Sequence, residues 1–360
     1  MRDPVTIRAA RPAEAPALLD LVREVDAESP FLPREPGEPP SWLVTGRPAE
    51  DLQAFQARGN ATVFVGEDGG RLVGYLGANG GRLARNRGVL TLKAGVRAAW
   101  HGRGLGTRLF AAAEDWAHAI GAHRLELTAA APNLRAHALY RRLGYVDEGS
   151  MRDAMQVAGA WRDELILGKP LSPADAPNWA PLLLDAVPPA LPGPLTIRPA
   201  GPEDADAYHA FDAAVRRETP FLLRGPEEGL AGPEHARRFL AGVRKRRAVT
   251  LAAVGADGGI AGAVSVWTGS HRRTAHDGAV ALAVRRDHWE CGVGTRLLAE
   301  AEAWAGGSGL HRLSAWILGH NARARRFAAS RGYAEEAVCR RYARIDGRFV
   351  DHVLVAKLLG

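Results

Sequence analysis

The chain has 360 residues, of which 46% are hydrophobic and 24% charged, and its formal net charge is +7. This length is about twice that of a typical single domain, so two domains with separate cores are expected. No apolar run approaches the roughly 18 residues that cross a bilayer, and the N-terminal segment lacks the apolar stretch of a secretory signal. These features predict a cytoplasmic protein with no membrane partner.

The composition also limits cofactors and partners. Cys291 and Cys339 are too few for a disulfide framework, and no Cys/His cluster has zinc spacing, so no metal is expected. Only four residues are lysine, and the arginines are scattered apart from the run 244–247. This pattern argues against a nucleic-acid partner, whereas a polyphosphate ligand suits a basic protein equally well.

In chain order, residues 6–8 read as a short strand, and helices follow at about 12–26 and 48–58. Strands are predicted at 62–66, 72–78, 89–96 and 125–127, because these runs are apolar and rich in β-branched residues. Apolar residues from Leu105 to Ile120 recur with helical spacing, and a further helix is predicted at 134–143. A final hairpin is expected at 154–167, around Gly159. Strands with helices on both faces predict an α/β fold with a mostly antiparallel mixed sheet.

The second half of the chain repeats the first. The segment that starts at Val96 reappears from Val284, 188 positions later, and continues without a gap for more than twenty residues. Nearer the start the offset is 190, where Glu28-Ser29-Pro30-Phe31-Leu32 matches Glu218-Thr219-Pro220-Phe221-Leu222. Between the copies, residues 171–194 include seven prolines, which disfavour a helix or central strand. We therefore predict domains at 1–170 and 195–360, joined by a proline-rich linker at 171–194.

A glycine-rich loop joins the strand at 89–96 to the following helix. Its sequence, Trp100-His101-Gly102-Arg103-Gly104-Leu105-Gly106, places glycines at alternate positions, which leaves backbone N–H groups open to a ligand. The start of the helix adds unpaired N–H donors and a positive dipole end, so the segment predicts an anion site such as one for pyrophosphate. It matches neither a dinucleotide-binding loop, because Leu109 stands where glycine is needed, nor a Walker loop, because no lysine precedes Thr107.

The segment resembles the loop of the GCN5-related N-acetyltransferases, the GNAT superfamily, with His101 at the family's Gln/Arg position. A second run, from Asn133 to Tyr140 and on to Gly144-Tyr145, is similar to the family's Asn-x-x-Ala-x-x-Leu-Tyr motif. The resemblance covers both copies and implies an N-acetyltransferase that uses acetyl-CoA as co-substrate and an amine as acceptor. It implies that the cofactor is bound by Val96, His101, Gly102, Arg103, Gly104, Leu105, Gly106, Thr107 and Asn133.

Acetyl transfer to an amine calls for a base, an oxyanion donor and an acid. The amine, with a pKa near 10, must lose a proton before it attacks, and the departing thiolate leaves more easily when protonated. The resemblance implies Tyr140 as the acid, and a backbone N–H near Val96 is the simplest oxyanion donor. The resemblance implies Glu126 as the base, and Glu28 is a candidate to bind the substrate ammonium. Each has an alternative: Tyr140 as a core aromatic, Glu126 as a solvated or salt-bridged strand residue, and Glu28 as a cap of the proline turn.

The two copies differ at three of these positions. Tyr140 corresponds to Ala328, Glu126 to Ser314, and Gly102 to Glu290, whose carboxylate would oppose a pyrophosphate. The N-terminal copy is therefore predicted to be the enzyme and the C-terminal copy to be degenerate. Two alternatives remain open at this stage: both copies are active, or the protein is a non-catalytic acyl-CoA sensor or scaffold. A monomer with an internal pseudo-dimer and a homodimer are both compatible with the repeat.

Overall fold

The computed structural model describes residues 5–40, 42–173, 178–182, 184, 193–244 and 247–359. The middle of the predicted linker at 171–194 and part of the basic run at 244–247 therefore lie outside the described residues. The chain forms two compact units. The first holds residues up to 178 together with 271–273 and 339–349, and the second holds the remainder. No helix among the described residues is long and apolar enough to cross a membrane.

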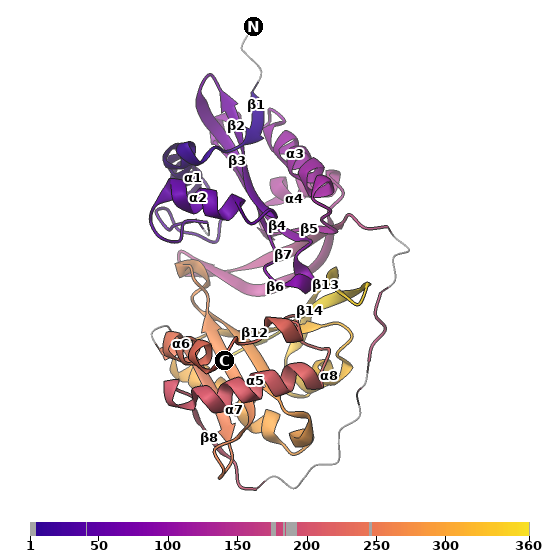
Figure 1. Cartoon of the computed structure of the whole chain (residues 1–360). Coiled ribbons are helices and arrows are strands. Elements are labelled where there is room, and N and C mark those ends of the chain that lie inside the picture. Colours follow the sequence, from indigo (N-terminus) through magenta and orange to yellow (C-terminus); the bar gives the residue numbers. More distant parts are fainter. Residues whose placement is uncertain are drawn as a thin grey trace. The chain divides into compact units, whose positions relative to one another are not determined.

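The first copy, here called the N-terminal domain, alternates strands and helices (Figure 1). Most predicted elements are present, but the last hairpin starts at Val146 instead of about Ala154, because register shifts near Gly149 and Met151 break the alternation that marks a strand. The elements are β1 Thr6–Ala9, α1 Ala15–Glu28, α2 Pro48–Gln56, β2 Ala61–Asp68, β3 Arg71–Gly80, β4 Val89–Val96, α3 Leu105–Ala119, β5 Arg124–Ala130, α4 Leu134–Arg142, β6 Val146–Val157 and β7 Ala160–Pro170.

The second copy, the C-terminal domain, repeats this order. Its elements are β8 Thr196–Pro199, α5 Ala205–Glu218, α6 Pro233–Arg244, β9 Ala248–Val254, β10 Ile260–Thr268, β11 Asp277–Val284, α7 Val293–Gly307, β12 Arg312–Leu318, α8 Ala322–Ser330, β13 Ala334–Ile345 and β14 Arg348–Leu358. Each element has a counterpart of similar length in the first copy, which confirms the duplication seen in the sequence.

The strands of the N-terminal domain lie in the order β1-β2-β3-β4-β5-β7-β6. Its neighbouring strands are antiparallel except for β4 and β5, which run parallel and pair only from Val89–Thr91 to Arg124–Glu126. Beyond Thr91 and Glu126 the described residues of these two strands do not pair, so the sheet opens toward the end of β4. The strands β11 and β12 do the same in the C-terminal domain, pairing only from Asp277–Ala279 to Arg312–Ser314.

Two apolar clusters cover the two faces of the N-terminal sheet. One face packs against α3 through residues such as Leu105, Leu109 and Leu125. The other packs against α1 and α2 through residues such as Leu18 and Leu52. Figure 1 shows α1 and α2 on one side of these strands and α3 on the other. The predicted mixed α/β sheet with helices on both faces is confirmed, and the opening between β4 and β5 lies between these layers.

Candidate active sites

The glycine loop of the N-terminal domain joins the end of β4 to the start of α3. Gly102 and Gly104 adopt left-handed backbone angles, with φ of 76° and 74°, which glycine adopts without a steric penalty. A Cβ atom at Gly104 would meet nothing within 4 Å. At Gly106, however, a Cβ would lie 3.3 Å from Leu139, so this glycine also permits close packing of α3 on α4. The side chain of Leu105 is buried, which leaves only its backbone for a ligand.

His101 braces the loop. Its Nε2 lies 2.8 Å from the carbonyl oxygen of Val96, and because a carbonyl only accepts, the ring nitrogen must donate. In the C-terminal domain Trp289 occupies the same position, and its indole N–H donates to the Val284 carbonyl, also at 2.8 Å. A histidine and a tryptophan thus make the same contact, which favours a packing role for His101.

Glu28 ties the end of α1 to the residues that follow β4. Its Oε2 accepts a hydrogen bond from the backbone N–H of Ala98 at 2.7 Å. Glu218 accepts from the N–H of Arg286, the matching residue, at the same distance. The repeated Glu-x-Pro-Phe-Leu segment therefore preserves a structural tether in both domains, and its retention does not by itself indicate an acceptor pocket.

Arg135, on α4, is a basic group that the sequence analysis did not single out. One terminal nitrogen of its guanidinium would lie 3.9 Å from a Cβ at Gly102, so the cation sits beside the loop. Arg103, within the loop, stacks over the Trp100 ring at 4.9 Å. Two exposed cations thus flank the backbone N–H groups at the start of α3, among them that of Thr107. Such a combination attracts an anion.

Asn133 caps α4. Its side-chain oxygen accepts a hydrogen bond from the Ala136 N–H at 3.2 Å, and Asn321 caps α8 in the same way at 3.0 Å. This contact satisfies one of the unpaired donors at a helix start. The repeated spacing of the Asn-x-x-Ala motif is thereby explained by helix capping, independently of any cofactor.

Tyr140 lies on α4 against the α3 side of the core. Its ring packs on Phe110, with centroids 5.4 Å apart, and on Tyr145, at 6.1 Å. Burial raises the pKa of Tyr140 to about 12, because the phenolate is poorly solvated there. The phenol therefore keeps its proton throughout the physiological range.

Glu126 faces a buried arginine. Arg124, fully buried, donates from Nε to Glu126 at 3.1 Å and from Nη1 to Glu148 at 3.0 Å. The hydroxyl of Thr91 also donates to Glu126 at 3.0 Å. One carboxylate oxygen of Glu126 thus holds the buried cation and the other accepts from Thr91, which is the salt-bridged alternative to a catalytic base.

Sequence reasoning missed a second carboxylate, Glu164 on β7. It is 7% exposed and accepts a hydrogen bond from the Thr128 hydroxyl at 3.3 Å. Burial raises the pKa of Glu164, and the positive charge of Lys93 partly opposes this rise. The side chain of Lys93 is exposed, and desolvation by the surrounding protein lowers its pKa. The signal in the sequence was a glutamate directly before the apolar run 165–167.

Asp26 and Arg34 continue this polar cluster toward α1. Arg34 donates to Asp26 at 3.0 Å and to the Tyr75 hydroxyl at 3.3 Å. The second oxygen of Asp26 is buried and has no hydrogen-bond partner among the described residues. Burial raises the pKa of Asp26, against the pull of Arg34. Lys93, Glu164, Asp26 and Arg34 thus form a cluster of two basic and two acidic groups. Such a cluster is suited to binding a polar ligand.

The corresponding loop of the C-terminal domain keeps its shape but not its charge. Glu290 adopts the left-handed φ of 66° and Gly292 one of 75°, as at Gly102 and Gly104. The Glu290 carboxylate forms an ion pair at 2.6 Å with Arg323, the counterpart of Arg135. Arg323 in turn stacks over the Trp289 ring at 4.9 Å. The cation that stands open to an anion in the first domain is therefore already paired in the second.

The buried arginine is common to both domains although its partner is not. Arg312 donates to Glu336 at 3.0 Å and 2.5 Å, as Arg124 does to Glu148. Ser314 replaces Glu126, but its hydroxyl donates at 3.0 Å to Asp277, which lies 3.5 Å from Arg312. Both domains thus place a carboxylate next to the arginine, from β5 in the first and from β11, the neighbour of β12, in the second. This exchange supports a structural role for Glu126.

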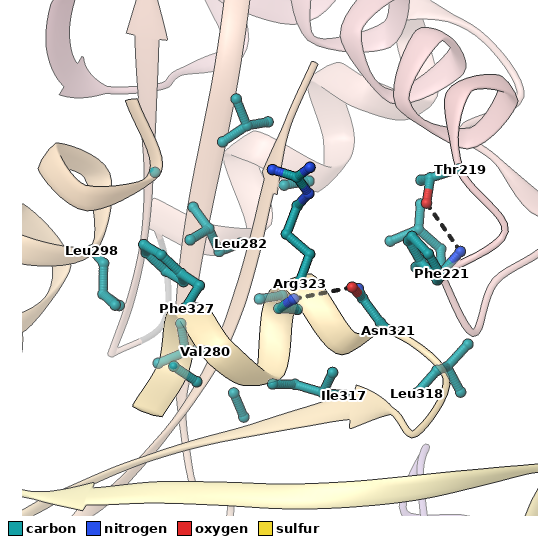
Figure 2. A pocket seen from close by; sticks show the side chains of 18 of the residues that line it. Thr219, Phe221, Val280, Leu282, Leu298, Ile317, Leu318, Asn321, Arg323 and Phe327 are labelled. Atoms are coloured by element: carbon teal, nitrogen blue, oxygen red, sulfur yellow. Dashed lines mark hydrogen bonds between the residues drawn. The ribbon is translucent and has the colours of Figure 1, made fainter. Parts of the chain in front are cut away.

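A cavity of about 500 Å³ opens between β11 and β12 of the C-terminal domain. Figure 2 shows Val280, Leu282, Ile317 and Phe327 around it, with Leu298 on α7. Ala328, which replaces Tyr140, also lines it. Among the described residues of the whole chain, no group of three or more His, Cys, Asp or Glu side chains is placed to hold a metal ion.

The fold and the two loop sites together define a protein made of two acetyltransferase-type domains. The model of the acetyltransferase (GNAT) family matches residues 27–145 and again 217–333, more than half of the chain. The chain therefore belongs to the GNAT family of acetyltransferases, as a tandem member with two copies of the domain.

Several solved structures resemble one copy. A GNAT-family acetyltransferase from Streptococcus pneumoniae is 32% identical, with a TM-score of 0.44, over 46% of this chain and 100% of its own. The ribosomal-protein-alanine N-acetyltransferase of Brucella melitensis is 26% identical, with a TM-score of 0.40, over 46% and 99%. The acetyltransferase yncA from Salmonella typhimurium, solved with acetyl-CoA, is 22% identical, with a TM-score of 0.43, over 49% and 99%. No curated protein matches the chain.

Proposed function

We propose that the N-terminal domain transfers the acetyl group of acetyl-CoA directly to an amine, either of a small molecule or of a peptide N-terminus. The observation that carries this proposal is the combination of an open, cation-flanked glycine loop with a partly buried, protonated Tyr140 on the adjacent helix α4. The family and the first-copy motifs support acetyl-CoA as the donor. A cytoplasmic location fits such an enzyme.

The loop and its cations are assigned to the phosphate part of acetyl-CoA. Gly102 and Gly104 present their backbone without side chains, and the first N–H groups of α3 lack helical partners. Arg135 and Arg103 add positive charge at the rim. Val96 and Asn133 remain assigned to the cofactor, with Val96 providing a backbone N–H for the developing oxyanion.

Glu164 is the carboxylate we assign to proton removal from the acceptor amine. Unlike Glu126 and Glu28, it is not tied to a buried arginine or a backbone N–H among the residues that the structure describes. Its raised pKa makes it a stronger base than an exposed glutamate, closer to the range in which a base works well at neutral pH. Thr128 donates a hydrogen bond that orients the carboxylate, and Lys93 limits the rise in its pKa.

Tyr140 is assigned to the leaving thiol. A thiolate of pKa about 8.5 departs more easily when a donor approaches its sulfur. Tyr140 is protonated at neutral pH, so its hydroxyl can donate as negative charge develops. In the C-terminal domain Ala328 offers no hydroxyl at this position, so the reaction is assigned to the N-terminal domain alone.

The test is a panel of amines assayed with acetyl-CoA and a thiol reagent that detects released CoA. The panel includes small primary amines, amino acids and short peptides with free N-termini. Steady release of CoA that depends on one class of amine, with acetylation of that amine confirmed by mass spectrometry, is the expected result. Binding of acetyl-CoA without amine-dependent turnover across the panel would instead favour a sensor or scaffold.

A further inference from the structure

Two aromatic rings of the N-terminal domain are replaced by smaller side chains at the cavity of the C-terminal domain, whereas Phe327 and Trp316 stand there in place of Leu139 and Thr128. In the N-terminal domain, Phe110 and Tyr140 pack together at 5.4 Å and fill the space between α3 and α4. Their counterparts in the second copy are Leu298 and Ala328, and both line the cavity. The volume of about 500 Å³ falls within the range of pockets that hold a small organic molecule.

The lining of this cavity is mostly apolar, although His288, Tyr333 and His352 also contribute to it. Aliphatic and aromatic side chains come from β11, β12, α7 and α8, as Figure 2 shows for Leu282, Ile317 and Phe327. Two of the polar side chains at its wall are turned to the backbone: Asn321 caps α8 at 3.0 Å, and Thr219 accepts from the Phe221 N–H at 3.1 Å. A space lined in this way favours an apolar ligand over water.

The entrance disfavours an anion. Glu290 stands in the loop where the first domain has glycine, and it holds Arg323 in an ion pair at 2.6 Å. An incoming phosphate would have to displace this carboxylate and would meet its negative charge. Where the N-terminal domain has an arginine beside glycine that is unpaired among the described residues, this loop therefore has an added carboxylate and a paired arginine.

We infer that the C-terminal domain is a binding site for an uncharged molecule with a medium-length aliphatic chain, and that it is not a second acetyl-CoA site. The aliphatic chain of the ligand occupies the cavity beside Leu298 and Ala328. Glu290 and Arg323 are paired with each other and therefore do not attract an anionic head group. This inference goes beyond the proposed acetyl transfer and does not depend on it, because it concerns residues of the other domain.

The experiment uses the full-length protein and calorimetric titration with 1-octanol. We expect one saturable site, and at least tenfold tighter binding of 1-octanol than of 1-butanol, because each buried methylene tightens binding by up to about fourfold. The double variant Leu298→Phe, Ala328→Tyr restores the two rings that the N-terminal domain accommodates. It should weaken 1-octanol binding at least tenfold and leave acetyl transfer by the N-terminal domain within twofold of wild type.

Two controls distinguish binding in this cavity from binding elsewhere on the chain. Ala334→Tyr adds the same side chain at an exposed position on β13 and should leave 1-octanol binding within twofold. In a chain carrying Gly104→Glu, which disables the N-terminal loop, octanoate and octanoyl-CoA should bind no more tightly than 1-octanol. Unchanged 1-octanol binding in the ring-restoring variant would overturn the inference. So would tighter binding of either anion, or two acetyl-CoA molecules per wild-type chain.

Discussion

Replacing Glu164 with glutamine should make acetyl transfer depend on the pH of the medium far more steeply. An amine with a pKa near 10 is about one part in 10³ unprotonated at pH 7. An enzyme with a working base can take the proton from the bound ammonium, whereas an enzyme without it can use only the small fraction of amine that is already unprotonated. The carboxylate is 7% exposed and held by Thr128, so a glutamine fits the same space.

The expected loss of kcat/KM follows from the small unprotonated fraction of the amine. We expect kcat/KM at pH 7 to fall by roughly 10² to 10³, within the usual range for loss of a general base. The deficit should shrink about tenfold for each pH unit and approach wild type near pH 10. The affinity for acetyl-CoA should stay within twofold, because the loop lies elsewhere. The assay is a pH–rate profile from about pH 6 to 10 with the best amine of the panel.

The matched control is Glu126→Gln, which removes a carboxylate on the neighbouring strand β5 that is engaged with Arg124. It should lower stability and leave the shape of the pH–rate profile unchanged. Glu164→Gln should not lower stability at pH 7. Since burial raises the pKa of Glu164 in the folded state, its contribution to stability is present at low pH and is lost as pH rises through that pKa. Two results would refute the assignment of Glu164 as the base. One is an unchanged pH–rate profile for Glu164→Gln, and the other is a loss of rate at low pH that shrinks as pH rises for Glu126→Gln.

Three further predictions concern single positions. Tyr140→Phe should lower kcat by ten- to a thousandfold while acetyl-CoA affinity, measured by calorimetry, changes only a few-fold; an unchanged kcat would return Tyr140 to a packing role. Gly104→Glu should abolish tight acetyl-CoA binding, because it adds a carboxylate and a strained φ of 74° to the loop; undiminished binding would remove the loop from the cofactor site. Arg312→Met should lower the free energy of unfolding, measured by urea titration, by about 3 to 5 kcal/mol, because it leaves the buried Glu336 carboxylate without its arginine. Adding Glu336→Leu should recover most of that loss.

The motifs of the sequence identified the fold because they depend on local backbone requirements. The alternate glycines, the Asn-x-x-Ala cap and the repeat at a fixed offset each specify one element and its neighbour. Residues 89–96 were predicted as a strand and form β4 with the same bounds. The hairpin at β6 and β7 was placed too late because its register shifts leave no regular alternation.

The site was harder to predict because its side chains come from distant strands. Glu164 and Lys93 influence each other only once β7 and β4 lie in one sheet, and the local signal for Glu164, a glutamate before an apolar run, does not reveal that partner. The pairing of Glu290 with Arg323 likewise depends on how α8 packs beside the loop. Glu28 was identified from the repeat, but a repeated residue can preserve a tether as well as a pocket, and only the contact with Ala98 distinguishes them.

The central claim is that catalysis resides in the N-terminal domain, and one variant tests it most directly. Full-length protein carrying both Gly104→Glu and Tyr140→Phe loses the proposed cofactor loop and acid of that domain but keeps the C-terminal domain intact. With the acceptor found in the amine panel, we predict turnover below one part in about 10³ of wild type, with the protein still folded by circular dichroism. Retention of a substantial fraction of the wild-type rate would show that the C-terminal domain is a working enzyme and would contradict the account.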